Sequence, residues 1–450
     1  VGGHDFKVSE QAQQGMNVAL SEFAPGRLVV LNKKTYRIGT VAASGPDTES
    51  NRAVPLFEQA RTYKHCTQCT YTAGFVAYDD GKTQCPQCGA ESIRSMMVIR
   101  PEIVYPSNKR EIDEFDDEQV FSRVTKAQLP LPDSDRRLET SPFGEYGGLA
   151  ATRTQSLVVV NEGDPSSAED GFRVCVKCGK VLLEGEQEGA HTRDYYVKVF
   201  KGSPPGKCDG EFQRVFLGYD FPSDILLLRV ALSSPLRYGV AERRNRKPLE
   251  DALQTLCDAL TLAIARTLDV DSREVSAGFR FGNDGKSEFA DIFVYDTLSG
   301  GAGYALEASK AFTSVFDEAV RLMNACDCSA SCEKCLRHYG NRFHHPDLDR
   351  FLGLDLARYV LTGEVPEELT SAQQKEVLMP LIEMVKLAGW EISDGGEAVQ
   401  VVHQGMRFAL AAFPSLRACE SRIKEGGTLR LTFTPYELSR DLPNAFAGLS

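Results

Sequence analysis

The sequence lacks any run that approaches the roughly 20 apolar residues that a membrane helix needs. It also lacks a signal peptide, because the opening residues Val1 to Asp5 contain neither a basic nor an apolar region. These absences predict a cytoplasmic protein that does not use the membrane as a partner. Because the chain begins with Val1, we expect it to be cut from a longer polypeptide.

Positive charge is also scarce, since 51 Lys and Arg stand against 63 Asp and Glu, a net charge of −12. Such a chain cannot coat nucleic acid by charge alone, so any binding must be local. Segment 225–250 is the best local candidate, with six basic residues against two acidic ones. A solvated loop before a helix explains this segment equally well. The candidate nucleic-acid-binding residues are Arg243, Arg244, Arg246, Lys247, Arg337 and Arg342.

A complete catalytic motif is missing too. Gly285 to Ser287 resembles the end of a phosphate-binding loop, but that loop needs a glycine where this chain has Arg280. Asp113 to Asp116 imitates an acidic helicase motif without the apolar strand that would aim it at magnesium. We predict no catalytic residue, and whether the chain belongs to an enzyme is left open by these residues.

Cysteine, in contrast, is abundant, with 13 residues. Paired thiols in a long chain without a signal peptide are typical of metal binding in a reducing compartment. In the first cluster, two Cys-x2-Cys turns can complete a tetrahedron of thiolates around one ion. This spacing predicts a zinc ribbon, with unligated or redox-active thiols as the alternative. The ligands would be Cys66, Cys69, Cys85 and Cys88.

The second cluster is irregular. It begins with Cys175 and Cys178, and the suitable partners nearby are His191 and Cys208. These four residues predict a zinc site of three cysteines and one histidine. The alternative is a surface loop histidine and a separately buried cysteine.

The third cluster places four cysteines within ten residues. This density favours zinc, and an iron–sulfur cluster is the less favoured alternative. Four ligands close a site, so all three clusters are expected to be structural. Cys257 and Cys419 are expected to be ordinary core thiols. The residues of the third cluster are Cys326, Cys328, Cys332 and Cys335.

The pattern of apolar and turn residues predicts an α+β multidomain protein. Two zinc modules are inserted in β-rich segments, and an α/β metal-binding domain and a small α/β C-terminal unit follow. An acidic stretch near 111–118 lies in a linker-like segment. The expected domains are residues 1–60 (β-rich), 61–100 (zinc ribbon), 101–170 (β/linker), 171–220 (second zinc module), 221–362 (α/β domain) and 363–450 (C-terminal unit).

Several elements can be predicted within this plan. Residues 28–39 and 275–295 have hairpin signals, and 225–232 is an apolar run typical of a buried strand. Apolar residues with three-to-four spacing predict a helix that has Pro248 in its first turn and extends to Leu268. Further helices are expected over 303–324, from a cap at Pro346-Asp347 to about 361, and over 371–388, with short strands after it.

The loop 296–303 joins a strand to a helix and contains three glycines. Its backbone N–H groups can line up to bind an anion such as a DNA phosphate. The alternative is a tight turn, which the presence of Asp296 favours. Asp291, Asp296 and Glu274 are too unconstrained in sequence to predict a nuclease site.

Residues 289–305, the third cysteine cluster, Asn341 and Leu348-Asp349-Arg350 together resemble a known family. It is the zinc-binding domain of unknown function first characterised in the helicase MrfA, the MZB domain. The resemblance covers about residues 220–362 and implies that the cysteines of the third cluster are its four zinc ligands. Such domains typically end superfamily 2 DEAD/DEAH-box helicases of DNA repair and of anti-phage defence, including Druantia and DISARM systems.

This resemblance implies a function for the whole chain. An ATP-dependent helicase core would precede it in the same polypeptide and would hold the ATP, with residues 1–60 as the junction. The chain would then be an accessory region that engages DNA and stabilises the motor, with a defence-system protein as a further partner. The alternative is a non-enzymatic, zinc-stapled scaffold that contacts a protein partner, which the acidic stretch suits.

Overall fold

The computed structural model describes residues 13–45, 49–107, 122–131, 138–183, 185–195, 206–236, 238, 243–283, 286–394, 399–418, 422–425 and 428–449. The chain divides into two compact units. Unit 1 comprises Val1–Cys85, Ala90–Arg136 and Gln155–Pro222. Unit 2 comprises Pro86–Gly89, Arg137–Thr154 and Ser223–Ser450. The acidic stretch 111–118 and Cys419 lie outside the described residues, and the finer domain boundaries stay predictions.

Unit 1 contains a three-stranded sheet of order β1-β2-β6. Its first two strands form the predicted hairpin, with Asn32 and Lys33 at the turn. Both residues have left-handed backbones, with φ of 52° and 65°, as a two-residue hairpin turn requires. The hairpin prediction is confirmed. The elements are α1 (Met16–Glu22), β1 (Leu28–Leu31), β2 (Lys34–Ala42), α2 (Val54–Glu58) and β6 (Ile103–Pro106).

A second sheet carries Cys66 of the first cysteine cluster and Cys175 of the second. The first half of the long strand β12 pairs in parallel with β5 and antiparallel with β9. Tyr63, Val98, Val160 and Phe216 form a buried core on this sheet. Its strands in unit 1 include β3 (Arg61–Cys66), β4 (Thr72–Val76), β5 (Ile93–Ile99), β9 (Phe172–Cys175) and the first half of β12 (Phe212–Leu232). Strands β10 (His191–Thr192) and β11 (Lys207–Cys208) form a separate two-stranded sheet.

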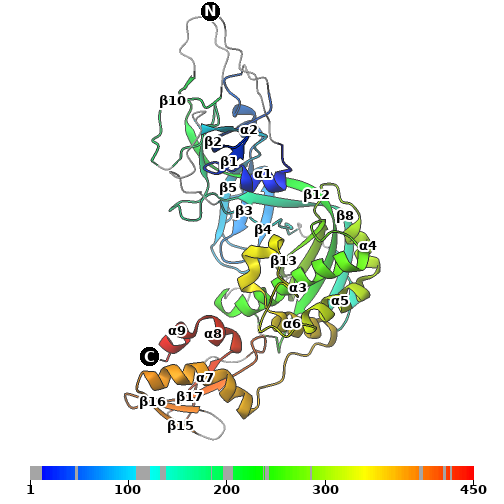
Figure 1. Ribbon diagram of the computed structural model, residues 1–450, viewed down its shortest axis with the longest axis vertical. Helices are drawn as coiled ribbons and strands as arrows, with labels where there is room; N and C mark the ends of the chain where they lie inside the picture. Colours follow the sequence, from blue (N-terminus) through cyan, green and yellow to red (C-terminus); the bar gives the residue numbers. More distant parts are fainter. Residues whose placement is uncertain are drawn as a thin grey trace, which may run out of the picture. The chain divides into compact units, whose positions relative to one another are not determined.

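Unit 2 is built on the hairpin of β13 and β14, which the second half of β12 extends. Helix α3 packs on β13 and β14 and also contacts α5 and α6 (Figure 1). Its apolar positions Leu249, Leu253, Leu256, Leu260 and Ile264 are all fully buried, so the predicted core face is confirmed. The elements are β7 (Ser141–Phe143), β8 (Gly147–Asn161, continuing into unit 1), α3 (Arg243–Leu268), β13 (Val275–Asn283), β14 (Glu288–Asp296), α5 (Phe312–Asn324) and α6 (Arg350–Thr362).

The predicted starts of two helices and the continuity of a third were wrong. Helix α3 begins at Arg243, so Pro248 lies inside it, and side-chain pairs one turn apart stabilise this extra turn. The predicted helix 303–324 is broken at Ala311 into α4 (Tyr304–Lys310) and α5. Helix α6 is capped by Asp349 rather than by Asp347, because residues 339–347 form a separate 3-10 helix, η3 (Tyr339–Asp347).

The C-terminal part of unit 2 has its own core. Helix α7 packs on a five-stranded sheet of order β15-β16-β17-β19-β18, as the sequence largely predicted, although β18 was missed. Leu381, Val385, Val401 and Leu410 are buried between them. The α+β multidomain fold is confirmed. The elements are α7 (Ser371–Leu387), β15 (Glu391–Asp394), β16 (Val399–His403), β17 (Met406–Ala412), β18 (Arg422–Glu425), β19 (Thr428–Phe433), α8 (Pro435–Arg440) and α9 (Leu442–Ala447).

Helix length and hydropathy bear on membrane insertion. Over the described part of the chain, no helix combines the length and apolar character needed to cross a membrane.

Candidate metal centres and nucleic-acid interface

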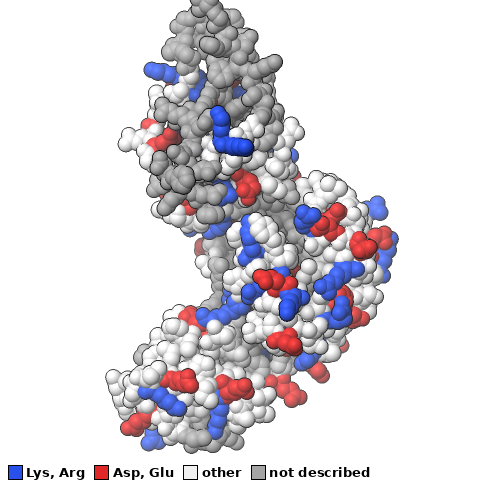
Figure 2. Space-filling model, in the orientation of Figure 1, with Lys and Arg blue, Asp and Glu red and all other residues white. Residues whose placement is uncertain are grey.

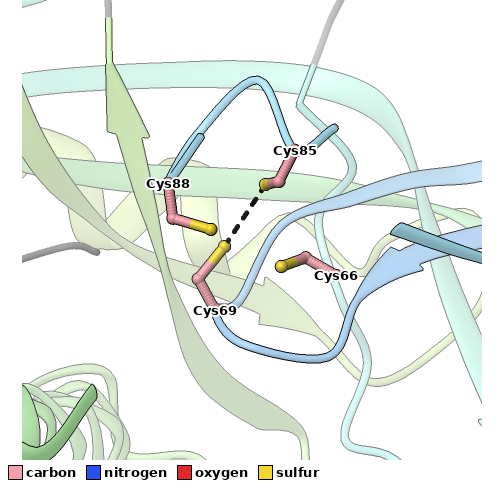
Figure 3. A group of neighbouring side chains, drawn as sticks. All are labelled: Cys66, Cys69, Cys85 and Cys88. Carbon is pink, nitrogen blue, oxygen red and sulfur yellow. Dashed lines mark hydrogen bonds between the residues drawn. The ribbon is translucent and has the colours of Figure 1, made fainter. Parts of the chain in front are cut away.

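The first cluster brings together Cys66 from the end of β3 and three cysteines from two turns. The four sulfur atoms lie within 4.8 Å of one another and point toward a common centre (Figure 3). The sulfur atoms of Cys69 and Cys85 are 3.6 Å apart. Two sulfurs bound to one zinc at about 2.3 Å lie about 3.8 Å apart at tetrahedral angles, whereas a disulfide needs about 2.05 Å. The arrangement therefore fits a zinc ion and not a disulfide.

The second cluster joins residues that are far apart in sequence. Strands β10 and β11 pair so that His191 lies opposite Cys208. The Nε2 atom of His191 is 3.1 Å from the sulfur of Cys178, and the sulfurs of Cys175 and Cys208 are 3.7 Å apart. The structure therefore groups the four residues, as the irregular spacing had suggested.

The orientation of His191 suits a metal ligand. Its Nδ1 atom donates to the carbonyl of Gly189 at 2.7 Å. That hydrogen bond places the proton on Nδ1 and leaves the Nε2 lone pair directed at the three sulfurs. A backbone carbonyl in this position is a usual companion of metal-bound histidine.

The third cluster follows α5 directly. Its sulfur–sulfur distances are 3.6 Å between Cys326 and Cys332, 3.7 Å between Cys328 and Cys335, and 3.8 Å between Cys332 and Cys335. All three distances agree with the edges of a tetrahedral zinc–thiolate site. The local turn alone therefore brings these ligands together.

Arg350, the first residue of α6, holds the third cluster in place. Its Nε donates to the carbonyl of Cys328 at 2.8 Å, and its Nη1 donates to the carbonyl of Met323 at 3.2 Å. A buried guanidinium that satisfies two loop carbonyls fixes the backbone from which the thiols project.

Hydrogen bonding favours thiolates in two of the clusters. A hydrogen bond from the Cys178 side chain lowers the pKa of Cys175 to about 4. The backbone of Cys328 lowers the pKa of Cys326 to about 7, whereas burial raises the pKa of Cys328 to about 12. The thiolate is the form that binds a metal. The lowered pKa values of Cys175 and Cys326 therefore favour the metal-binding form of these two side chains.

Each group consists of four cysteine or histidine donors, and none includes a carboxylate. A catalytic zinc keeps one position open for water, whereas four such ligands fill the tetrahedron. The donor sets therefore suit structural zinc, and the ligand role of each residue remains a proposal.

The predicted basic residues at the start of α3 fall into different environments. The side chains of Arg243 and Arg244 lie outside the described residues. Arg246 is only 1% exposed, pairs with Glu250 and lies over the ring of Phe281. It would have to leave these partners to reach a phosphate, and its role as a nucleic-acid contact stays a prediction.

Lys247 is half-exposed but is already paired. Its ammonium group lies 2.5 Å from Asp251 and 2.9 Å from Asp347. These ion pairs join α3 to the end of η3. A phosphate would have to compete with two carboxylates for this side chain.

Near the third cluster, the structure places two predicted basic residues differently. Arg337 is half-buried and donates to the hydroxyl of Ser331 at 2.9 Å. Arg342 is exposed, and its guanidinium lies over the rings of Tyr339 and Phe343. The sequence analysis missed these two aromatic residues, which lie on either side of Asn341 in η3.

The loop 296–303 is occupied by the protein's own anion. The carboxylate of Asp296 is buried and accepts from the backbone N–H groups of Ala302, Gly303, Tyr304 and Ala305 at 2.6–3.2 Å. These are the donors that a phosphate would need. The tight-turn alternative therefore describes this loop.

Asp291 is also engaged in the interior. It is fully buried between the guanidinium groups of Arg229 and Arg280, at 2.8 Å and 3.1 Å. Its oxygens are directed at these cations and not toward Asp296 and its N–H groups. The acidic residues therefore support the hairpin and do not assemble into a nuclease site.

Comparison with known proteins agrees with this architecture. Residues 256–336 match the family described as MZB, the MrfA Zn-binding domain. The chain is 36% identical over 425 residues to the Druantia protein DruE of Escherichia coli (strain UMEA 4076-1). The aligned region covers 92% of this chain and 23% of DruE, so the chain spans about a quarter of that relative.

Solved structures of the DUF1998 helicase MrfA also match. MrfA bound to DNA gives a TM-score of 0.31 at 14% identity, covering 53% of this chain and 26% of MrfA. MrfA bound to DNA and AMPPNP gives 0.29 at 10% identity, covering 74% and 28%. Scores this low carry no argument about function.

Residues 256–336 of the chain therefore match the MZB zinc-binding family, as the resemblance implied. Along nearly its whole length the chain is similar to the Druantia protein DruE.

Proposed function

We propose that this chain is the zinc-binding accessory region of an ATP-dependent DNA helicase of anti-phage defence or DNA repair. It engages DNA and stabilises a motor that lies in the same polypeptide and binds the ATP. The observation that supports this is the 36% identity to a Druantia protein over 92% of the chain, together with the MZB match. A further protein of the defence system is the expected additional partner.

In this proposal the three clusters are structural zinc sites. Each site holds together a segment that is too short to bury a core of its own. The free energy of zinc binding then contributes directly to the free energy of folding of that segment. Elemental analysis should find three zinc ions per chain in a colourless protein. Iron and a brown colour would instead favour an iron–sulfur cluster in the third site. The proposed ligands are Cys66, Cys69, Cys85 and Cys88; Cys175, Cys178, His191 and Cys208; and Cys326, Cys328, Cys332 and Cys335.

DNA engagement is assigned to a local surface near the third cluster and the start of α3. Segment 337–345 contains Arg337, Arg342 and three histidines, and it has no acidic residue. Elsewhere on the face shown in Figure 2, basic and acidic side chains are interspersed. A local site is therefore favoured over a broad basic surface. The proposed contacts are Arg243, Arg244, Lys247, Arg337 and Arg342.

Charge reversal tests this assignment. Arg243→Glu with Arg244→Glu should weaken DNA binding and make its salt dependence shallower, by a slope of about 1 for each phosphate that is no longer neutralised. Fluorescence anisotropy over a series of salt concentrations measures both. Lys310→Glu with Lys386→Glu is the matched control, because it makes the same charge change on α4 and α7.

Two results would count against the DNA assignment. If the variant and the unchanged chain had equal DNA affinity and equal salt dependence, the proposed DNA contacts of α3 would be wrong. A chain that binds no DNA at low salt, but binds a protein of its own defence system, would favour the scaffold alternative.

A further inference from the structure

Helix η3 exposes two aromatic rings to solvent. Tyr339 is 80% exposed and Phe343 is 73% exposed, which are unusual values for such large apolar side chains. Both rings lie on the helix that follows the third cysteine cluster, drawn in yellow close to α3 in Figure 1. We call Tyr339 and Phe343 the η3 aromatic pair.

An arginine links the two rings. The guanidinium carbon of Arg342 lies 4.3 Å from the ring centroid of Tyr339 and 4.4 Å from that of Phe343. Cation–π contacts of this kind contribute about 0.5–1 kcal/mol each at exposed sites. The three residues therefore form one surface made of two π-systems and a planar cation.

The surface stands on a rigid support. Between the exposed residues, Asn341 is 3% exposed and donates to Asp258 of α3 at 3.1 Å and to the carbonyl of Leu336 at 2.9 Å. His345 donates to the side-chain oxygen of Asn341 at 2.9 Å. Because Leu336 directly follows Cys335, these bonds tie η3 to the third cluster and to the core helix.

The chemistry of the surface selects its ligand. Aromatic rings with an arginine stack on bases, and every base has a π-face to offer when it is unpaired. A duplex keeps these faces inside its own stack. The neighbouring Arg337 and the absence of acidic residues from 337 to 345 suit a strand that carries phosphates.

We propose that Tyr339 and Phe343 are a base-stacking site for single-stranded DNA, with Arg342 between them. This rests on the proposed DNA-engaging function and adds the residues and the strand form that it recognises. The site would hold unpaired bases, whereas the basic residues of α3 would contact phosphates.

The test uses the full chain and the double variant Tyr339→Ala, Phe343→Ala. Anisotropy is measured with a labelled single strand, with the same strand carrying abasic sites, and with a duplex. The variant should lose about 5- to 150-fold in affinity for the intact strand for each ring that stacks. Its affinity for the abasic strand and for the duplex should equal that of the unchanged chain.

Matched variants separate stacking from folding. Tyr339→Phe with Phe343→Tyr keeps both rings and should keep the affinity. Tyr78→Ala removes an equally exposed ring, at 77% exposure, from unit 1 and should change nothing. Zinc content and thermal unfolding of the Ala variant should match the unchanged chain, because both side chains are exposed.

Three results would overturn the inference. One is an unchanged affinity of the Ala variant for the intact strand, and another is an equal loss on the abasic strand and the duplex. The third is intact DNA affinity together with the loss of a protein partner or of self-association, which would make the pair a protein contact. In all three the unchanged chain still binds DNA, so the proposed function survives, whereas no DNA binding at all would remove both.

Discussion

The second and third cysteine clusters assemble the same kind of donor set by opposite routes. The third takes its four thiols from ten consecutive residues and is braced by Arg350. The second closes a loop from Cys175 to Cys208, and its histidine comes from a two-stranded ladder. The entropy cost of closing a loop grows with its length. Metal should therefore contribute more to local order in the second cluster than in the third.

Metal removal should have the largest effect. Chelation at neutral pH should abolish amide protection in β9, β10 and β11, since structural zinc contributes about 10 kcal/mol or more to the folding of small modules. Helix α3 should stay protected, because it has its own apolar core. Hydrogen exchange with mass spectrometry measures both regions. Simultaneous loss of protection in α3 and β9 would show that the clusters are not independent.

Single ligand substitutions should remove one ion each. His191→Ala and Cys335→Ser should both lower the zinc content from three to two per chain, but only His191→Ala should expose β9, β10 and β11 to protease. The buried Cys257→Ala is the control and should keep three ions, because Cys257 belongs to the apolar core. Elemental analysis measures the zinc content, and limited proteolysis measures the exposure of the second cluster. A protease-resistant His191→Ala chain would contradict the expectation that metal contributes more to local order in the second cluster than in the third.

Removing the Arg350 hydrogen bonds that support the third cluster should have a smaller effect, on metal affinity. Arg350→Ala removes the donors to the carbonyls of Cys328 and Met323. Loss of such supporting bonds typically lowers metal affinity about 10- to 100-fold. Competition with a coloured chelator should show one weakened ion, with the other two unchanged. Arg358→Ala on the same helix is the control.

The last effect is a pH dependence that arises in unit 2. The pKa of Asp355 on α6 is raised to about 6, mainly by burial; Arg358 opposes the shift and Asp349 adds to it. The folded chain therefore binds a proton more tightly than the unfolded chain, so stability falls as pH rises from about 4 to about 6. The loss is at most about 3 kcal/mol. Asp355→Asn should flatten this part of the stability curve in denaturant titrations, and an unchanged slope would show that Asp355 is not responsible.

Prediction from the sequence succeeded where the information is local. The hairpins and the apolar face of α3 follow from turn residues and from helical spacing. The start of α3 was missed because its first turn depends partly on a distant contact, that of Arg246 with Phe281. The start of α6 was missed because the backbone of Asp349, which caps it, donates to the distant Thr255 of α3. The exposed pair Tyr339 and Phe343 was missed because a spacing pattern does not show which face of a helix is covered.

The sequence by itself determined the three sets of thiols and the MZB resemblance, since ligand spacing and motif residues are properties of the chain. Tertiary structure decided between the alternatives that the sequence left open for His191 and Cys208 and for the loop of Asp296, and it alone decided that Arg246 is enclosed. Each of these depends on which distant groups come within a few ångströms. Such proximity is fixed by strand pairing and by core packing, and not by the order of neighbouring residues.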